Sequence, residues 1–254
     1  MRGFPRGCRP RRPALVLGAA WWSALIAGAL FSLLTLWVVR AQGRLLPGEA
    51  VAHRWSVEHR PPAVVVVARA LTDTGTGVLP YLLLLAGGLV AGRTPRGGAV
   101  TAALLLSALG AGQAVRYAVM TGVGRARPPI GDWATRASGW AFPSGHAATA
   151  AMTAGLLVAA LSLRGDRPPR AAVAAIALWG AAVGLTRVEL GVHWVGDVIG
   201  GWLFAAMWLS LLIGLYLRWS GRRTRGQPVS RRLSTKPVPV VTGTPKRQPG
   251  REPR

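Results

Sequence analysis

Two histidines and an aspartate in the second half of the chain have the chemistry and the spacing of a catalytic group. His193 and Asp197 are four residues apart, so on a helix their side chains share one face. A carboxylate one turn away can hold an imidazole in one tautomer and stabilise its cation. A second histidine, His146, suits a general acid. We therefore predict His193 as a nucleophile, Asp197 as its orienting group and His146 as the general acid.

Residues 142–146, with the sequence Phe-Pro-Ser-Gly-His, are predicted to form the start of a helix. Pro143 suits the first helical turn, Ser144 can cap free backbone N–H groups, and Gly145 lets a ligand approach the backbone. The N-terminus of a helix is a ready anion site. On these five residues alone, a helix cap beside one interfacial histidine is the simpler interpretation, and the rest of the chain favours an anion site.

Arginines near these motifs can supply the positive charge that a bound anion needs. Arg127 and Arg187 offer planar forks that match phosphate oxygens. Combined with the two histidines, they indicate phosphoryl transfer. The alternative is a set of helix caps and interfacial charges, which the joint pattern makes the weaker interpretation.

The rest of the sequence predicts the frame that positions these residues. The chain has 254 residues, 51% of them hydrophobic, and a net charge of +23. Its apolar residues gather in runs near the ~20 residues that span a bilayer. We expect an all-α, six-transmembrane-helix bundle, with a surface loop or helix at 40–62 and a short packed segment at 63–71. The expected spans are 14–39, 78–92, 99–123, 144–163, 171–185 and 195–217.

Basic tails are expected to flank this membrane domain of residues 14–217. Residues 1–13 hold five arginines, and residues 218–254 hold eleven Lys or Arg against one Glu. The second tail is expected to be disordered. No soluble basic domain stands apart from the apolar runs, so we expect no nucleic-acid partner. Cys8 is the only cysteine, which excludes an intramolecular disulfide and a cysteine metal cluster.

The distribution of arginines predicts which face of the membrane each loop occupies. Loops 93–98 and 164–170 hold two and three arginines and fall on the same face as both tails. Since cytoplasmic loops carry an excess of Lys and Arg, we expect both termini in the cytoplasm. The chemical motifs then lie on the extracytoplasmic face.

Taken together, the motifs resemble those of the type 2 phosphatidic acid phosphatase superfamily, which includes membrane lipid phosphatases and is related to vanadium haloperoxidases. The resemblance covers roughly residues 60–215. Thr186 stands where the family has serine. The matching residues are Arg127, Pro128, residues 143–146, Arg187, His193 and Asp197.

One element of the family pattern is missing. Met120 stands seven residues before Arg127, where the family has a lysine. Either Arg116 or Arg125 substitutes for the lysine, or the site has one cation fewer. We propose Arg116, one helical turn further back. We otherwise expect Arg125 and Arg136 to be solvated loop charges.

Two further histidines, His53 and His59, lie in a polar stretch and show no partner pattern. We expect both to be surface residues. Asp132 is expected to be a turn residue.

The resemblance implies a metal-independent, cofactor-free hydrolase that acts on a lipid phosphate through a phosphohistidine. The substrate would be an undecaprenyl-type diphosphate, phosphatidylglycerophosphate or phosphatidate, and the oligomeric state is left open. Two alternatives remain: a transferase of the phosphoryl or lipid-phosphate group, and a non-catalytic lipid binder or transporter on the same fold. The residues expected to hold the phosphate are Arg116, Arg127, Ser144, Gly145 and Arg187.

Overall fold

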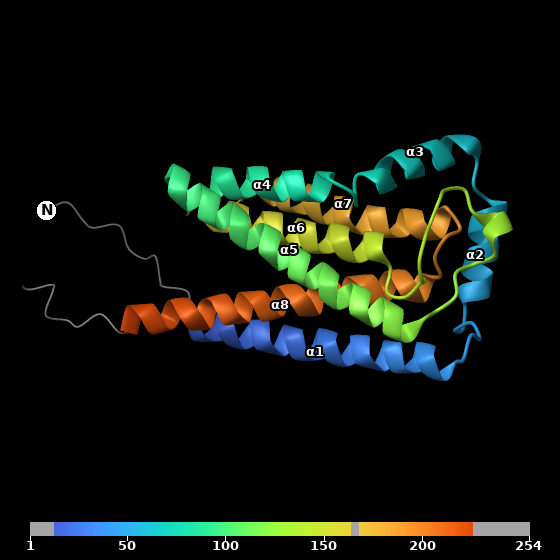
Figure 1. The fold of residues 1–254 in the computed structure, drawn as a ribbon, viewed down its shortest axis with the longest axis horizontal. Coiled ribbons are helices and arrows are strands. Elements are labelled where there is room, and N and C mark those ends of the chain that lie inside the picture. Colours follow the sequence, from blue (N-terminus) through green and yellow to red (C-terminus); the bar gives the residue numbers. More distant parts are fainter. Residues whose placement is uncertain (1–12, 164–167, 226–254) are drawn as a thin grey trace, which may run out of the picture. The chain divides into compact units, whose positions relative to one another are not determined.

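Residues 13–163 and 168–225 are described by a computed structural model, and within these ranges the chain forms helices and connecting segments without any strand. The prediction of an all-α protein is confirmed. The predicted tails fall largely on residues 1–12 and 226–254, outside the described part, but residues 218–225, which were expected to be disordered, continue α8, so that part of the prediction is wrong. The helices, labelled in Figure 1, are α1 (Pro13–Arg40), α2 (Glu49–Glu58), α3 (Pro62–Asp73), α4 (Leu79–Ala91), α5 (Pro95–Val123), the 3₁₀ turn η1 (Ile130–Asp132), α6 (Gly145–Leu163), α7 (Arg170–Glu189) and α8 (Val195–Arg225).

Five of these helices, α1, α5, α6, α7 and α8, are long and apolar enough to cross a membrane, judged by length and composition. Helix α4 is apolar but has only 13 residues, fewer than the ~20 that span a bilayer. The six predicted spans therefore correspond to five long helices and the shorter α4. The two pieces expected at the surface, 40–62 and 63–71, contain α2 and α3.

Local sequence sets the limits of α5, the helix that leads into the site. Thr94 is its N-cap, and the Oγ1 of Thr94 accepts a hydrogen bond from Gly97 N over 3.1 Å, which satisfies a free donor of the first turn. At the other end Gly124 has φ 61°, the left-handed conformation that ends helices and favours glycine. The chain therefore turns directly into the segment 124–144, which carries Arg125 and Arg127.

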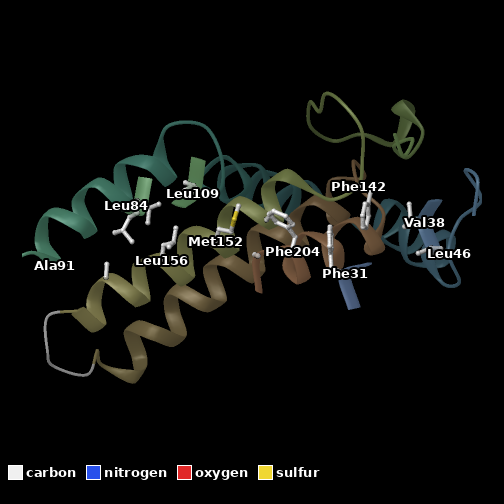
Figure 2. Packing of buried hydrophobic residues seen from close by; sticks show 14 residues of the cluster. Phe31, Val38, Leu46, Leu84, Ala91, Leu109, Phe142, Met152, Leu156 and Phe204 are labelled. Atoms are coloured by element: carbon white, nitrogen blue, oxygen red, sulfur yellow. The ribbon is translucent and has the colours of Figure 1, made fainter. Parts of the chain in front are cut away.

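Helix α6 packs against α4, α5 and α7 and is the most buried of the five long helices. A cluster of buried hydrophobic residues lies along these contacts, and Figure 2 shows Leu84, Met152 and Leu156 within it. Near the start of α6, the ring of Phe142 stacks on Phe31 of α1 with 6.0 Å between centroids. This packing fixes the N-terminal end of α6, where the motif of residues 143–146 lies.

Helices α1 and α8 lie side by side (Figure 1). Phe31 of α1 contacts Phe204 of α8 edge-on, with 5.6 Å between centroids. Further along, a Cβ on Gly28 would lie 3.4 Å from the Sδ of Met207. Helix α8 carries Asp197 in its first turn, so α1 packs against the helix that carries this aspartate.

Contacts divide the chain into two units, Met1–Leu217 and Arg218–Arg254, and the site lies wholly within the first. In that unit α2, α3 and the segment 124–144 gather at one end of helices α5, α6 and α7, and the connection between α4 and α5 lies at the opposite end (Figure 1). The loop 93–98 and the segment 124–142, which the arginine pattern assigned to opposite faces, are thus at opposite ends of the helices.

Candidate active site

His193 and Asp197 form the buried centre of the site. The Nδ1 of His193 lies 3.3 Å from the Oδ2 of Asp197, and the same oxygen accepts a hydrogen bond from Trp194 N over 2.9 Å. Both side chains are at most 1% exposed. Because the carboxylate can only accept, it assigns the proton of the neutral imidazole to Nδ1 and leaves the lone pair on Nε2. The predicted contact between His193 and Asp197 is present.

A tight turn between α7 and α8 presents His193 to the site. Gly191 has φ +71°, and a Cβ there would lie 2.5 Å from the carbonyl oxygen of Asp132, so this position requires glycine. The next residue, Val192, donates from its backbone N to the carbonyl of Arg187 over 3.2 Å. The turn that carries His193 is therefore bonded back to the last turn of α7.

The motif of residues 143–146 is tied directly to the catalytic pair. Ser144 donates from its backbone N to the carbonyl oxygen of Asp197 over 2.9 Å. Helix α6 begins at Gly145, so Pro143 precedes the first turn and the predicted place of Pro143 inside that turn is wrong. The Oγ of Ser144 is buried and has no hydrogen-bond partner among the described residues. Ser144 therefore offers a hydroxyl to a ligand and does not use it as a helix cap.

Arg127 is held against His193 by a ring of carbonyl groups. Its Nη1 lies 2.8 Å from the Nε2 of His193 and donates to Val192 O over 2.9 Å. Its Nε and Nη2 donate to the carbonyls of Ser138, Gly139 and Trp140. All five donors of the guanidinium are thus engaged, so the fork predicted to bind phosphate is occupied by protein groups.

Arg187 is the largest fully buried side chain among the described residues. Its Nη1 donates to the Oγ1 of Thr72, at the end of α3, over 3.0 Å. Its Nε is buried and has no partner in the described part of the chain. A buried charged donor without a partner costs stability, so Arg187 is a strong candidate to hold an anion.

His146 lies in the first turn of α6, and its Nε2 is 3.1 Å from the Oγ1 of Thr76. Thr76 belongs to the turn between α3 and α4. Thr72 and Thr76 thus support Arg187 and His146 from α3 and the turn that follows it. No periodic pattern points to them, because they act through single contacts distant in sequence.

Arg116, the proposed substitute for the missing lysine, lies beside the start of α6. A Cβ on Gly145 would lie 3.5 Å from the Cζ of Arg116. The Nε of Arg116 donates to Gln113 Oε1 over 3.1 Å, and its Nη1 lies 3.5 Å from the Sδ of Met120. The position of Arg116 is therefore compatible with the proposal, and Met120 lies next to its guanidinium.

Arg125, the other possible substitute for the missing lysine, points away from Arg116 and towards two carboxylates. Its Nη1 donates to the Oδ1 of Asp197 over 2.6 Å, and its Nη2 donates to the Oε2 of Glu49 over 2.5 Å. Arg125 is 8% exposed, so the expectation of a solvated loop charge is wrong. Arg125 is buried because it pairs with one carboxylate from α2 and one from α8. The sequence around Arg125 does not indicate these partners.

A cavity of about 340 Å³ joins the site residues. Its wall contains six of the eight predicted site residues, while Ser144 and Asp197 are buried directly behind it. Two aromatic residues in the wall, Tyr117 and Trp140, are 58% and 47% exposed. The lining residues are Arg116, Tyr117, Met120, Arg127, Ser138, Gly139, Trp140, Gly145, His146, Arg187 and His193.

The electrostatics of the site favour the neutral form of His193. Burial lowers the pKa of His193 to about 4, against the opposing effect of Asp197 and with the help of the charges of Arg127 and Arg187. Burial also lowers the pKa of the Arg127 guanidinium. For Arg125, burial lowers the pKa, but the hydrogen bonds and charges of Glu49 and Asp197 outweigh it and the net shift is upward.

The described residues contain no group of three or more His, Cys, Asp or Glu side chains arranged to hold a metal ion. Outside the cavity, His53 is buried and its Nε2 lies 3.0 Å from the Oδ2 of Asp132. The expectation of a surface histidine is thus wrong for His53, and Asp132 is more than a turn residue. His59 is exposed, as expected, and its ring stacks on Trp55.

Comparison with known proteins connects this geometry to a family. Residues 101–221 match the family model described as the PAP2 superfamily. A lipid A 1-phosphatase of Rhizobium johnstonii is 38% identical over 96 residues, which is 36% of each chain. A lipid A 1-phosphatase of Rhizobium etli is 37% identical over 124 residues, 44% of this chain and 50% of that protein. The matches thus span half or less of the length of these curated relatives.

A solved structure shares the fold. It is the transmembrane PAP2-type phosphatidylglycerolphosphate phosphatase from Bacillus subtilis, with a TM-score of 0.60 and 23% identity, and the likeness covers 82% of this chain and 99% of that one. The family model runs from α5 into α8 and contains all eight predicted site residues. The chain is therefore a multi-pass membrane protein with the fold of a PAP2-type phosphatase, and residues 101–221, just under half of its length, match the PAP2 superfamily.

Proposed function

We propose that this protein is a membrane lipid phosphatase that works through a phosphohistidine. One observation carries the proposal: His193 lines a cavity whose wall also contains Arg116, Arg187 and His146, while the Nδ1 of His193 lies 3.3 Å from the Oδ2 of Asp197. A nucleophile with its orienting acid, an anion site and a second histidine are the parts that phosphoryl transfer needs. The names of the Rhizobium relatives, lipid A 1-phosphatases, support a phosphatase acting on lipid.

Binding of the phosphoryl group comes first. Its oxygens meet the unpartnered Nε of Arg187 and Oγ of Ser144, and Arg116 and the backbone N–H groups after Gly145 add further donors. Arg127 then moves its Nη1 from the Nε2 of His193 to a phosphoryl oxygen, which frees the nucleophile as the substrate arrives. Together these donors offset the charge that develops in the transition state.

Chemistry follows in two steps. The Nε2 of His193 attacks phosphorus, the bond to the leaving oxygen breaks, and His146 gives that oxygen a proton. Asp197 accepts the Nδ1–H hydrogen bond throughout and stabilises the charged imidazole. Water then attacks phosphorus while His146 takes its proton, the N–P bond breaks, and phosphate leaves.

A lipid substrate fits the surroundings of the cavity. Tyr117 lies on α5, a helix long enough to cross the membrane, and it lines the cavity together with Trp140. Both rings are partly exposed, and aromatic residues favour the membrane interface. A phosphorylated headgroup can therefore enter between them while the acyl chains stay in the bilayer. We further propose that both termini are cytoplasmic and that the cavity opens on the extracytoplasmic side.

The test is release of inorganic phosphate by the purified protein in detergent, with EDTA present and without any added acceptor. The panel contains undecaprenyl diphosphate, phosphatidylglycerophosphate, phosphatidate and, because of the relatives' names, lipid A 1-phosphate. Release that EDTA leaves unchanged is the expected result. If no lipid of the panel releases phosphate, the proposal fails, and release that depends on an alcohol acceptor would indicate a transferase instead.

A further inference from the structure

Behind the catalytic pair, away from the cavity, a buried chain of charges continues into α2. Arg125 bridges two carboxylates: Asp197 at 2.6 Å and Glu49 at 2.5 Å. The side chains of Arg125, Asp197 and Glu49 are 7%, 0% and 4% exposed, respectively. Interactions between charges are strong at such burial because water screens them little. Four side chains, from Glu49 through Arg125 and Asp197 to His193, are thus joined by successive contacts.

Backbone hydrogen bonds fix both carboxylate oxygens of Glu49. Its Oε1 accepts from Gly196 N over 3.1 Å, and its Oε2 accepts from Leu46 N over 2.8 Å in addition to Arg125. Gly196 N belongs to the first turn of α8, where free N–H groups and the helix dipole favour a carboxylate. A Cβ on Gly196 would lie 2.6 Å from the Oε1 of Glu49, so glycine at this position is what lets the carboxylate reach α8.

We propose that Glu49 is a positioning residue that sets the orientation and the charge of the His193–Asp197 pair through Arg125. Without Glu49, the whole charge of Arg125 acts on Asp197 and weakens the field that stabilises a charged His193. With Glu49 present, one carboxylate balances Arg125 and the other stays available to the imidazole. Glu49 lies outside the family match of residues 101–221. Helix α2 therefore supplies the second carboxylate of Arg125, which the matched residues alone do not provide. The kinetic part of this inference rests on the proposed function.

The kinetic test compares Glu49→Gln with Glu49→Asp and with Glu58→Gln, an exposed glutamate at the other end of α2. Because Glu49 does not line the cavity, Glu49→Gln should lower kcat by about tenfold or more, the size found for outer partners of functional histidines, with KM unchanged. Glu49→Asp keeps the charge and should recover part of kcat, and Glu58→Gln should match the wild type. A wild-type kcat in Glu49→Gln would overturn the proposal.

A double variant separates positioning from a general loss of stability. If Glu49 acts through Asp197, Glu49→Gln should lower kcat no further once Asp197→Asn is present, because coupled residues are not additive. Losses that multiply in full would mean that Glu49 acts by another route, and the proposal would be wrong.

A spectroscopic measurement decides the inference even if no lipid of the panel is a substrate. The chain has four histidines, so ¹⁵N-histidine labelling gives a simple spectrum, and the variant His193→Gln assigns the signals of His193. Glu49→Gln should shift the Nδ1 and Nε2 signals of His193 and leave those of the exposed His59 in place. Unchanged His193 signals would refute the positioning role, whereas a shift without any turnover would leave only the proposed function in doubt.

Discussion

The Nη1 of Arg127 lies 2.8 Å from the Nε2 of His193, the atom that would attack phosphorus. The arginine thus covers the nucleophile in the absence of substrate, and four backbone carbonyls hold it there. An arginine cannot accept a hydrogen bond, so this contact requires the lone pair of the imidazole to be on Nε2. The resting site is therefore in the protonation state that attack needs.

We predict that His193→Ala abolishes turnover and that Asp197→Asn costs less. The first change removes the nucleophile, and the second spoils its orientation and leaves the imidazole. In a comparable triad the orienting carboxylate is worth about 10⁴-fold and the nucleophile more. Phosphate release by purified variants checks this, with the exposed His59→Ala as the control. Wild-type release by His193→Ala, or the reverse ranking, would show that the roles are wrongly assigned.

The low pKa of His193 predicts a pH dependence. A free histidine titrates near ~6.5, whereas the folded pKa is about 4 because the ring is buried and two arginines lie near it. The unfolded chain therefore binds an extra proton between about pH 6.5 and 4, so the contribution to stability falls as the pH falls through this window. The difference in thermal midpoint between wild type and His193→Gln should show this fall. A difference that does not vary with pH would mean that His193 titrates normally.

Thr76→Val tests the support of the general acid. In the wild type, the Oγ1 of Thr76 lies 3.1 Å from the Nε2 of His146. Valine keeps the shape of threonine but cannot make this hydrogen bond. We expect kcat to fall about 2- to 10-fold, which corresponds to one net hydrogen bond. The loss should be smaller with an aryl phosphate, whose leaving group needs little protonation. The control is Thr121→Val, an exposed threonine that bonds only to carbonyls of its own helix, and an equal loss in both variants would contradict this role of Thr76.

The missing lysine is tested by Arg116→Ala and Met120→Lys, alone and together. If Arg116 holds the phosphate, its removal should lower turnover by about 10²-fold or more, as for one donor of a preorganised anion site. Met120 lines the cavity beside the guanidinium, so a lysine there should restore part of the loss. Arg96→Ala, an exposed arginine of the same helix, should behave as wild type. Unchanged turnover in Arg116→Ala would show that the site works with one cation fewer.

The orientation in the membrane is tested with cysteines on a Cys8→Ala background. Gly131 is exposed, and a side chain there meets open space. Gly131→Cys should react with a membrane-impermeant thiol reagent in intact cells, whereas Arg96→Cys, at the opposite end of α5, should react only after lysis. The opposite pattern would place the cavity in the cytoplasm.

The sequence by itself determined the parts of the site that depend on local spacing. The interval of four residues between His193 and Asp197 fixes one helical face, and apolar runs of near bilayer length predict the membrane helices. Those parts agree with the structure: both side chains meet, and five long helices with the short α4 replace the six expected spans.

Only the tertiary structure decided the partners that are distant in sequence. Arg125 was expected in solvent and is buried between Glu49 and Asp197, which lie 76 and 72 residues away. Thr72 and Thr76 reach Arg187 and His146 across 115 and 70 residues. A single hydrogen bond between distant residues requires one particular side chain at one position. It places no requirement on the neighbouring turns, so it leaves no periodic pattern in the sequence. The motifs therefore specify the reacting groups, and packing of α2 and α3 against them decides what holds those groups in place.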